Sequence, residues 1–157
     1  MKVRLLNKIT KKHEKVIILP ASWADLIAAD KSGNFQFSWE SEKKKEVFKL
    51  QVEASREVLG MMALKDMPHE IRIDINAIEA SKQNVGVNKV YEGIAGFLIA
   101  FACRQAFLRG YGGFVSLTPK TLLIEHYRQV YGFTQMGTKL CTYDENSETL
   151  IETYLKG

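Results

Sequence analysis

The stretch that decides the fold is residues 89–116, KVYEGIAGFLIAFACRQAFLRGYGGFVS. It opens with a turn containing Gly93 and Gly96, continues as a strongly apolar segment, and ends after Gly110 in the strand-like run GFVSL. Upstream, IRIDINAI at 71–78 alternates isoleucine with polar residues, as a half-buried strand does. The order strand, glycine-bearing turn, helix, strand brings backbone N–H groups and the positive end of a helix dipole to a phosphate. The sequence therefore predicts a protein that binds a phosphate-bearing cofactor.

Length and composition favour a single globular domain spanning residues 1–157. The chain is 46% hydrophobic, which is enough for a core, and its net charge is +4. Basic and acidic residues are mixed, which disfavours a nucleic-acid surface, while a mild positive charge suits a small polyanion. The longest apolar run is about half of the roughly 20 residues that span a bilayer, and the first residues lack the apolar core of a signal peptide. We expect a cytoplasmic protein that does not bind membranes.

The two cysteines indicate neither a metal site nor a disulfide scaffold. Cys103 and Cys141 lie far apart, and neither belongs to a CxxC pair or a Cys/His cluster. Cys103 sits in the middle of the apolar segment, where a buried thiol acts as a small hydrophobic side chain. No metal ligand set is predicted.

The rest of the pattern is typical of an α+β fold. Ser22 and Asp25 approximate a capping box and begin a short helix. Strands are predicted at 3–9 or 16–19, at 35–39, 47–52, 58–64 and 71–78, and as a final pair at 137–143 and 148–154. Further helices are predicted at 90–109 and 121–131, the second closed by Gly132, and a polar loop at 80–88.

Two common phosphate-binding motifs do not fit. A P-loop requires GxxxxGK[ST], which the sequence lacks. A dinucleotide-binding fold requires GxGxxG after the first strand of a repeated βαβ unit, and neither 93–96 nor 110–113 has that spacing. The one βαβ-like unit also follows several hairpin-type strands, which is the wrong order for a doubly wound sheet.

From Val58 to Tyr143 the chain resembles the GCN5-related N-acetyltransferases, the GNAT family. In that family a strand pairs with the pantetheine arm of coenzyme A, and a Q/R-x-x-G-x-G/A turn then wraps the pyrophosphate and opens a long helix. Gly93 and Ala95 fit the two small positions of that turn, and HYRQVYGF at 126–133 resembles the family's Tyr…Gly-Phe helix end. Val90 stands where the family has Gln or Arg, and Glu92 where it has a basic residue. The resemblance implies an α+β acyl-CoA N-acyltransferase fold with a mixed, twisted central sheet flanked by helices.

The resemblance also implies roles for individual residues. Glu79, just past the strand that would line the cleft, is the expected general base, and Tyr127 is the expected acid for the departing thiolate. His126 is a weaker alternative base, and both Glu79 and Tyr127 have the alternative of purely structural roles. The residues expected to contact the cofactor, mostly through their backbone, are Ile78, Ala80, Lys89, Tyr91, Glu92, Gly93, Ile94, Ala95, Gly96, Lys120 and Thr121.

The function implied is acetyl transfer from acetyl-CoA to an amine by direct attack, because no nucleophilic Cys or Ser constellation is visible. The acceptor, a small molecule or a protein amine, is not readable from the sequence, and a homodimer remains open. Four aromatic residues either line an acceptor pocket or belong to the core: Trp23, Phe35, Trp39 and Phe48. The alternative function is a catalytically inactive GNAT-fold domain that binds a ligand or another protein, which Val90 and Glu92 favour.

Overall fold

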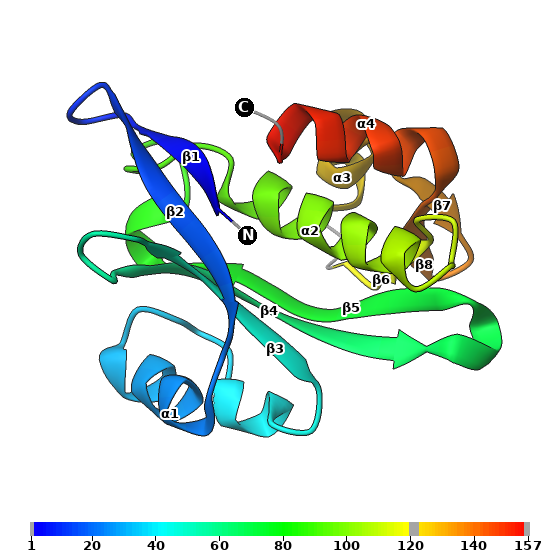
Figure 1. Ribbon diagram of the computed structural model, residues 1–157, viewed down its shortest axis with the longest axis horizontal. Coiled ribbons are helices and arrows are strands. Elements are labelled where there is room, and N and C mark those ends of the chain that lie inside the picture. Colours follow the sequence, from blue (N-terminus) through cyan, green and yellow to red (C-terminus); the bar gives the residue numbers. More distant parts are fainter. Residues whose placement is uncertain (1, 120–122, 156–157) are drawn as a thin grey trace. The chain divides into compact units, whose positions relative to one another are not determined.

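The computed structural model describes residues 2–119 and 123–155, which form a mixed sheet with strand order β1-β2-β3-β4-β5-β6-β8-β7 (Figure 1). The strands are β1 (Lys2–Asn7), β2 (Lys12–Pro20), β3 (Glu46–Val52), β4 (Val58–Met67), β5 (Arg72–Ala80), β6 (Val115–Leu117), β7 (Thr134–Met136) and β8 (Lys139–Thr142). The helices are α1 (Trp23–Ser32), α2 (Ile94–Leu108), α3 (Ile124–Tyr131) and α4 (Asp144–Tyr154). Short 3₁₀ turns cover Trp39–Glu42, Pro68–Glu70 and Lys82–Asn84.

The chain forms two compact units. The N-terminal unit contains Met1–Ala63 and Ala77–Leu98, and the C-terminal unit contains Leu64–Asn76 and Ile99–Lys156. Strands β4 and β5 and helix α2 contribute residues to both units. The turn that precedes α2 therefore belongs to the N-terminal unit, and α3 belongs to the C-terminal unit. A single domain stays a prediction.

The N-terminal unit begins with an antiparallel hairpin. Strands β1 and β2 pair in the register Val3↔Val16, and β2 then pairs with β3, also antiparallel. Buried apolar residues alternate with half-buried or exposed ones along both strands, and the buried set contains Val3, Leu5, Val16 and Ile18. One face of the hairpin is thus fixed against the core, because a shift of one residue would expose the whole apolar set.

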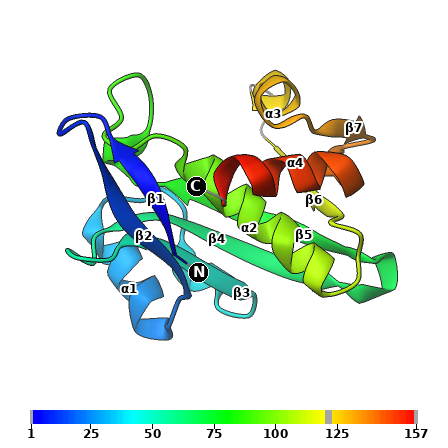
Figure 2. The same cartoon turned by 45° about the horizontal axis from the view of Figure 1, so that its top comes forward.

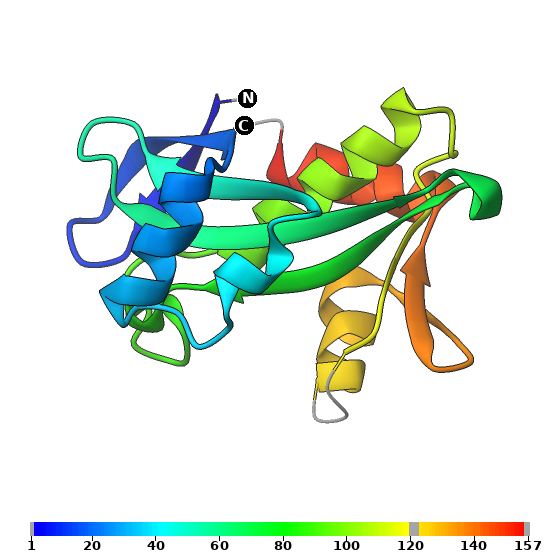
Figure 3. The same ribbon diagram turned by 90° about the horizontal axis from the view of Figure 1, so that it is seen from below.

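Helix α1 begins where the sequence predicts it. The Ser22 side chain accepts a hydrogen bond from the Asp25 amide at 3.2 Å, and the Asp25 carboxylate accepts one from the Ser22 amide at 2.8 Å. This reciprocal capping box satisfies two amides that the helix itself cannot pair. Figure 3 shows α1 in front of the strands, and its buried residues pack in a cluster that includes Trp39, Val47, Met61 and Ala63.

Strand β4 is covered on both faces in the N-terminal unit. Met61 and Ala63 point toward α1, while a Cβ at Gly60 would lie 2.8 Å from the Ile94 side chain and 3.2 Å from the Leu98 side chain of α2. Residues of a strand alternate between faces, so the helices α1 and α2 sandwich this strand. The glycine lets the beginning of α2 approach the sheet closely.

The C-terminal unit contains a parallel pair of strands. Strand β6 pairs with β5 in parallel, from Ile73↔Val115 to Ile75↔Leu117, and β8 pairs antiparallel with both β6 and β7. Helix α4 runs beside α2 in two views (Figures 1 and 2), and its buried Ser147 donates a hydrogen bond to the Gly113 carbonyl at 2.7 Å. Cys103 in α2 is fully buried, as predicted.

Most predicted elements are confirmed, and two strands are wrong. Both candidates for the first strand form strands, as β1 and β2, and Gly132 ends α3 with φ 70° as predicted. Residues 35–39 form no strand, because side-chain carboxylates bind the backbone amides of this loop. Residues 148–154 belong to α4 rather than to a strand, and the final hairpin is β7–β8. Helix α2 begins at Ile94, four residues later than predicted.

Candidate cofactor and acyl-transfer site

The predicted pyrophosphate turn leads directly into α2. Gly93 adopts a left-handed conformation, with φ 81°, and its carbonyl accepts the first helical hydrogen bond, from the Phe97 amide at 2.9 Å. The amides of Ile94, Ala95 and Gly96 therefore lie ahead of the helical ladder, where an α-helix has no partner of its own to offer. Together with the positive end of the helix dipole, these amides form a geometry suited to an anion.

The amides just before Gly93 are already engaged within the protein. The Val90 amide donates to the Gln83 carbonyl at 3.2 Å, the Tyr91 amide to the Asn84 side chain at 2.8 Å, and the Glu92 amide to the Leu6 carbonyl at 3.3 Å. The predicted backbone contacts from Tyr91 and Glu92 to a pyrophosphate would have to displace these bonds. The available donors are thus those from Ile94 to Gly96.

The β1–β2 hairpin lies alongside this turn (Figure 2). Asn7 forms a β-bridge with Tyr91, and the Lys8 amide donates to the Val90 carbonyl at 2.7 Å. The Lys8 ammonium lies 3.3 Å from the Glu92 carboxylate, and both side chains are partly exposed. Glu92, the acidic departure from the family turn, is therefore paired with a cation from the hairpin. Sequence reasoning missed Lys8 because 84 positions separate it from Glu92 in the chain.

Buried polar contacts fix the turn to the hairpin. The Tyr91 side chain is buried, and its hydroxyl donates to the Glu14 carboxylate, which also accepts from the Asn7 amide group at 3.3 Å. Burial and the Glu14 carboxylate raise the pKa of Tyr91 to about 12, so that the phenol stays protonated and keeps donating. Asn84, also buried, donates to the Ser81 hydroxyl at 2.8 Å. Tyr91 holds the turn in place through its side chain, a role that the sequence did not indicate.

Glu79 projects from the end of β5 to the same face as Ala77, the face that packs on the α1 cluster. Its carboxylate accepts three hydrogen bonds, from the Gln36 amide at 2.5 Å, the Phe37 amide at 3.2 Å and the Trp39 indole at 3.1 Å. The carboxylate thus holds the loop that follows α1. A carboxylate has about four acceptor positions, so one remains for a water or a substrate amine.

The neighbours Ile78 and Ala80 lie in the last part of β5. Within the described residues, β6 pairs with β5 only as far as Ile75, whereas β5 continues to Ala80. The β5 backbone at Ile78 and Ala80 is therefore not covered by β6. An extended ligand with amide groups can pair with such a strand as another strand would.

Tyr127 lies in α3, in the C-terminal unit. Its ring is buried against the rings of Tyr131, Phe133 and His126, with centroids 5.7, 5.8 and 6.1 Å away. Burial raises the pKa of Tyr127, which keeps the phenol protonated at neutral pH. This is the state that a general acid requires. Lys120 and Thr121 fall outside the described residues.

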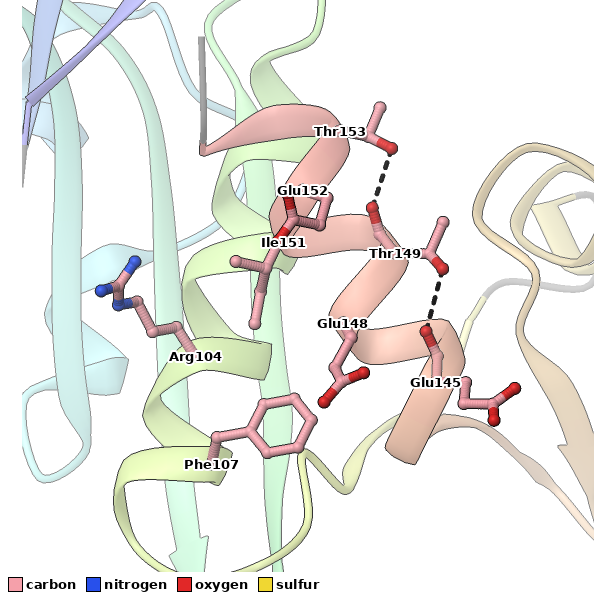
Figure 4. Close-up of a pocket in the computed structure, with 8 residues that line it drawn as sticks. All are labelled: Arg104, Phe107, Glu145, Glu148, Thr149, Ile151, Glu152 and Thr153. Carbon is pink, nitrogen blue, oxygen red and sulfur yellow. Dashed lines mark hydrogen bonds between the residues drawn. The ribbon is translucent and has the colours of Figure 1, made fainter.

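Outside the turn, β5 and α3, the described residues show no second candidate site for the cofactor. A hollow of about 900 Å³ forms an open groove between α2 and α4, and none of the predicted site residues lines it (Figure 4). Its Thr149 and Thr153 hydroxyls each donate to a carbonyl four residues earlier. In residues 2–119 and 123–155, no cluster of three or more His, Cys, Asp or Glu side chains is arranged to hold a metal ion. In the same part of the chain, no helix is long and apolar enough to cross a membrane.

The comparisons with known proteins rest on structure. No protein-family model and no curated sequence matches the chain. Mutant forms of the spermidine/spermine N-acetyltransferase SpeG from Vibrio cholerae superpose with a TM-score of 0.62 at 12% identity, over 85% of this chain and 98% of SpeG. The structure of AtaTR bound with acetyl-CoA superposes with a TM-score of 0.58 at 11% identity, over 87% of this chain and 98% of the AtaTR chain. The structure of YhhK from E. coli bound to coenzyme A superposes with a TM-score of 0.53 at 12% identity, over 82% of this chain and 96% of the YhhK chain.

The fold is that of the GNAT N-acetyltransferases. The predicted fold class, a mixed sheet flanked by helices, is confirmed. By the resemblance that the sequence indicated, β5 corresponds to the family's pantetheine-pairing strand. Residues 89–96 correspond to its pyrophosphate turn, and α2 to the helix that follows that turn. At such low identities the likeness concerns the fold, and the activity has to be argued from this chain's own residues.

Proposed function

We propose that this GNAT-fold protein is an acetyl-CoA-dependent N-acetyltransferase. The observation that carries the proposal is a set of amides, at Ile94, Ala95 and Gly96, for which the described residues provide no hydrogen-bond partner. They stand at the start of a long helix that follows the part of β5 not paired with β6. These amides suit a pyrophosphate, and the β5 backbone at Ile78 and Ala80 suits the amides of a pantetheine arm. The donor set therefore fits acetyl-CoA.

Charge balance at the turn supports the same proposal. A lone carboxylate at Glu92 would repel a pyrophosphate, but Lys8 lies 3.3 Å from it and cancels its charge. Lys89, half-buried at the beginning of the turn, adds a further positive charge. The proposal thus accommodates the two departures from the family motif, since cations from neighbouring positions replace the missing basic side chain.

In the proposed mechanism the bound cofactor supplies an acetyl thioester, and the chain handles two protons. An acceptor amine loses a proton to Glu79, directly or through one water, as it forms its bond to the acetyl carbon. Tyr127 donates its phenolic proton to the departing sulfur, and water restores that proton afterwards. Amides between Ile78 and Ala80 are the proposed donors to the thioester oxygen. No covalent bond to the protein is required.

Binding of acetyl-CoA tests the function directly. We expect calorimetric titration to give saturable binding in the micromolar range, with no comparable binding of ATP. Because Glu92 lies next to the proposed phosphate site, Glu92→Gln should tighten acetyl-CoA binding about five-fold, and Lys8→Gln should weaken it about five-fold. Lys12→Gln, the same change elsewhere on the hairpin, serves as the control. A folded protein that ignores acetyl-CoA at millimolar concentration contradicts the proposal.

Glu79→Gln separates catalysis from cofactor binding. Glutamine keeps one acceptor oxygen but turns an NH₂ group toward one of the loop amides, and it cannot accept a proton. We expect acetyl transfer to fall about a hundred-fold, with acetyl-CoA affinity nearly unchanged. Steady-state rates with a panel of amines, beside calorimetry of the same variant, provide the measurement. Unchanged turnover would remove Glu79 from the mechanism and leave it as the anchor of residues 36–39.

A second function has one observation in its favour. The amides of Tyr91 and Glu92, two of the predicted phosphate donors, are bonded within the protein. If these bonds and Glu92 exclude the pyrophosphate, the chain is instead an inactive GNAT-fold domain that binds a ligand or a protein. The titration above distinguishes the two functions.

A further inference from the structure

The two oxygens of the Glu79 carboxylate are not equivalent. Oε1 accepts hydrogen bonds from the Phe37 amide at 3.2 Å and from the Trp39 indole at 3.1 Å. Oε2 accepts one from the Gln36 amide at 2.5 Å, and the described residues provide it with no second donor. Each carboxylate oxygen has two acceptor positions, so Oε1 is filled and Oε2 keeps one position open. Only Oε2 can receive a proton without the loss of a hydrogen bond.

The three donors differ in how firmly the protein holds them. The Gln36 and Phe37 amides belong to the loop that follows α1, and Gln36 is exposed. The Trp39 side chain is fully buried, and it packs with Val47 and Met61 in the α1 cluster. A large ring in a close-packed core stays in one orientation. The indole N–H therefore marks a fixed position for Oε1, whereas the two amides move with their loop.

The backbone of Trp39 is fixed as well. Its amide donates to Oδ1 of Asp30 at 2.7 Å, and the next amide, of Glu40, donates to Oδ2 of Asp30 at 3.1 Å. Asp30 lies in the last turn of α1. The ring is thus held by the core and the main chain by α1, and the contacts lead from α1 through Trp39 to Glu79. All of these residues belong to the N-terminal unit.

We infer that Trp39 is a positioning residue for acetyl transfer, whose indole N–H holds Oε1 of Glu79 and leaves Oε2 to receive the proton of the acceptor amine. The role in the reaction rests on the proposed function, whereas the hydrogen bond does not. As the amine nitrogen forms its bond to the acetyl carbon, its proton passes to Oε2, and Oε1 keeps both donors. The last torsion of a glutamate side chain has a broad profile. Without the indole, the carboxylate therefore turns over a wider range, and the open position of Oε2 is less well oriented.

Trp39→Phe keeps an aromatic ring in the core and removes the N–H donor. We expect kcat for acetyl transfer to a panel of amines to fall about ten-fold. The KM for the amine and the affinity for acetyl-CoA should stay nearly unchanged, because Trp39 acts through Glu79 and not on either substrate. Val47→Ala is the control, since it removes apolar volume from the same cluster but none of the donors to Glu79. Its kcat should equal that of the wild type.

A second replacement separates the donor from the shape of the side chain. Benzothienylalanine has the shape of tryptophan, with sulfur in place of the indole N–H. The chain has two tryptophans, so a tryptophan auxotroph supplied with this analogue labels position 39 alone in the Trp23→Phe background. We expect the same fall of about ten-fold in kcat relative to Trp23→Phe, even if Trp39→Phe packs too poorly to fold.

The indole N–H resonance of Trp39 gives a measurement that does not depend on activity. Trp23→Phe leaves this signal as the single indole signal of the chain. A hydrogen bond to a charged acceptor is stronger than one to a neutral acceptor, so Glu79→Gln should move the proton signal upfield and speed its exchange with water. Glu40→Gln, the same change at an exposed neighbour of Trp39, should leave the signal in place.

Three results would overturn the inference: an indole signal that ignores Glu79→Gln, an unaltered kcat after loss of the N–H donor, or an equal loss of kcat in Val47→Ala. A raised KM with unchanged kcat would also contradict it, because Trp39 would then contact the amine itself. A chain that binds no acetyl-CoA would refute the proposed function and with it the role of Trp39, even where the indole signal responds. A chain that acetylates amines at the full rate without the donor would refute this inference alone.

Discussion

Asp74→Ala is expected to lower the free energy of unfolding of the C-terminal unit by about 3 kcal/mol. One oxygen of the Asp74 carboxylate accepts hydrogen bonds from the Ser116 hydroxyl at 2.8 Å, the Lys139 ammonium at 3.1 Å and the Arg72 guanidinium at 3.2 Å. Asp74 and Arg72 are 13% and 14% exposed, and Ser116 is fully buried. Removing the carboxylate leaves the mostly buried Arg72 guanidinium and the Lys139 ammonium without the partner that they share. Urea denaturation of the wild type and the variant measures the difference.

Glu70→Gln is the matched control for this prediction. Glu70 lies 3.0 Å from the same Arg72 guanidinium, but its side chain is 54% exposed. Exposed ion pairs contribute little, so the control should change the free energy of unfolding by less than about 1 kcal/mol. Asp74→Asn keeps the shape and removes only the charge, and we expect it to fall between the two. Equal effects of Asp74→Ala and Glu70→Gln would show that burial of the network contributes nothing.

The fold was predictable wherever local sequence and tertiary packing agree. The capping box of Ser22 and Asp25 acts within one turn of helix, and the alternation at 71–78 is imposed by one buried face. The turn at Gly93 was predictable because a left-handed conformation before a helix favours glycine. Each of these signals lies within a few residues of the structure that it determines.

The two wrong strands have physical causes. Phe35, Phe37 and Trp39 alternate as in a strand, but the Glu79 carboxylate, some 40 positions away, accepts hydrogen bonds from the Gln36 and Phe37 amides, which a strand would pair. Residues 148–154 contain threonine, isoleucine and tyrosine, which favour strands. Their packing is helical instead, with Ser147 and Leu150 buried three residues apart in α4. Here the spacing of the buried positions was a better guide than residue preference.

The candidate site was predictable only in part. The turn and the residues after it follow from the sequence, whereas several contacts that hold the turn come from the first 14 residues of the chain. Lys8 pairs with Glu92, Asn7 bridges to Tyr91, and Glu14 accepts from the Tyr91 hydroxyl. Such contacts depend on a hairpin that folds back on a distant turn, and no local pattern encodes the distance between them. The sequence shows that Glu92 departs from the family turn, but it does not show that Lys8 neutralises the Glu92 charge.

Gly60→Ala tests how closely α2 must approach the sheet. The added methyl would lie 2.8 Å from the Ile94 Cγ2 atom, 3.2 Å from the Leu98 Cδ1 atom and 3.2 Å from the Glu79 carbonyl oxygen. The Glu79 contact is to backbone, and Ile94 is branched at Cβ, so neither neighbour can move aside cheaply. We expect a loss of about 2 to 3 kcal/mol in the free energy of unfolding, measured in urea. Since α2 begins at Ile94, its displacement should also weaken acetyl-CoA binding about ten-fold.

A second substitution distinguishes crowding from an intrinsic effect of the strand position. Ile94→Ala removes the atom closest to the new methyl, so the double variant Gly60→Ala, Ile94→Ala should be more stable than the sum of the single changes predicts, by about 1 kcal/mol. Additive losses would mean that the methyl group at position 60 does not press on α2, and that crowding does not explain why this position is glycine. If the coupling is present and acetyl-CoA affinity recovers with it, then the amides of Ile94–Gly96 act as a phosphate site only when α2 lies close to β4. The same glycine would then serve both packing and binding.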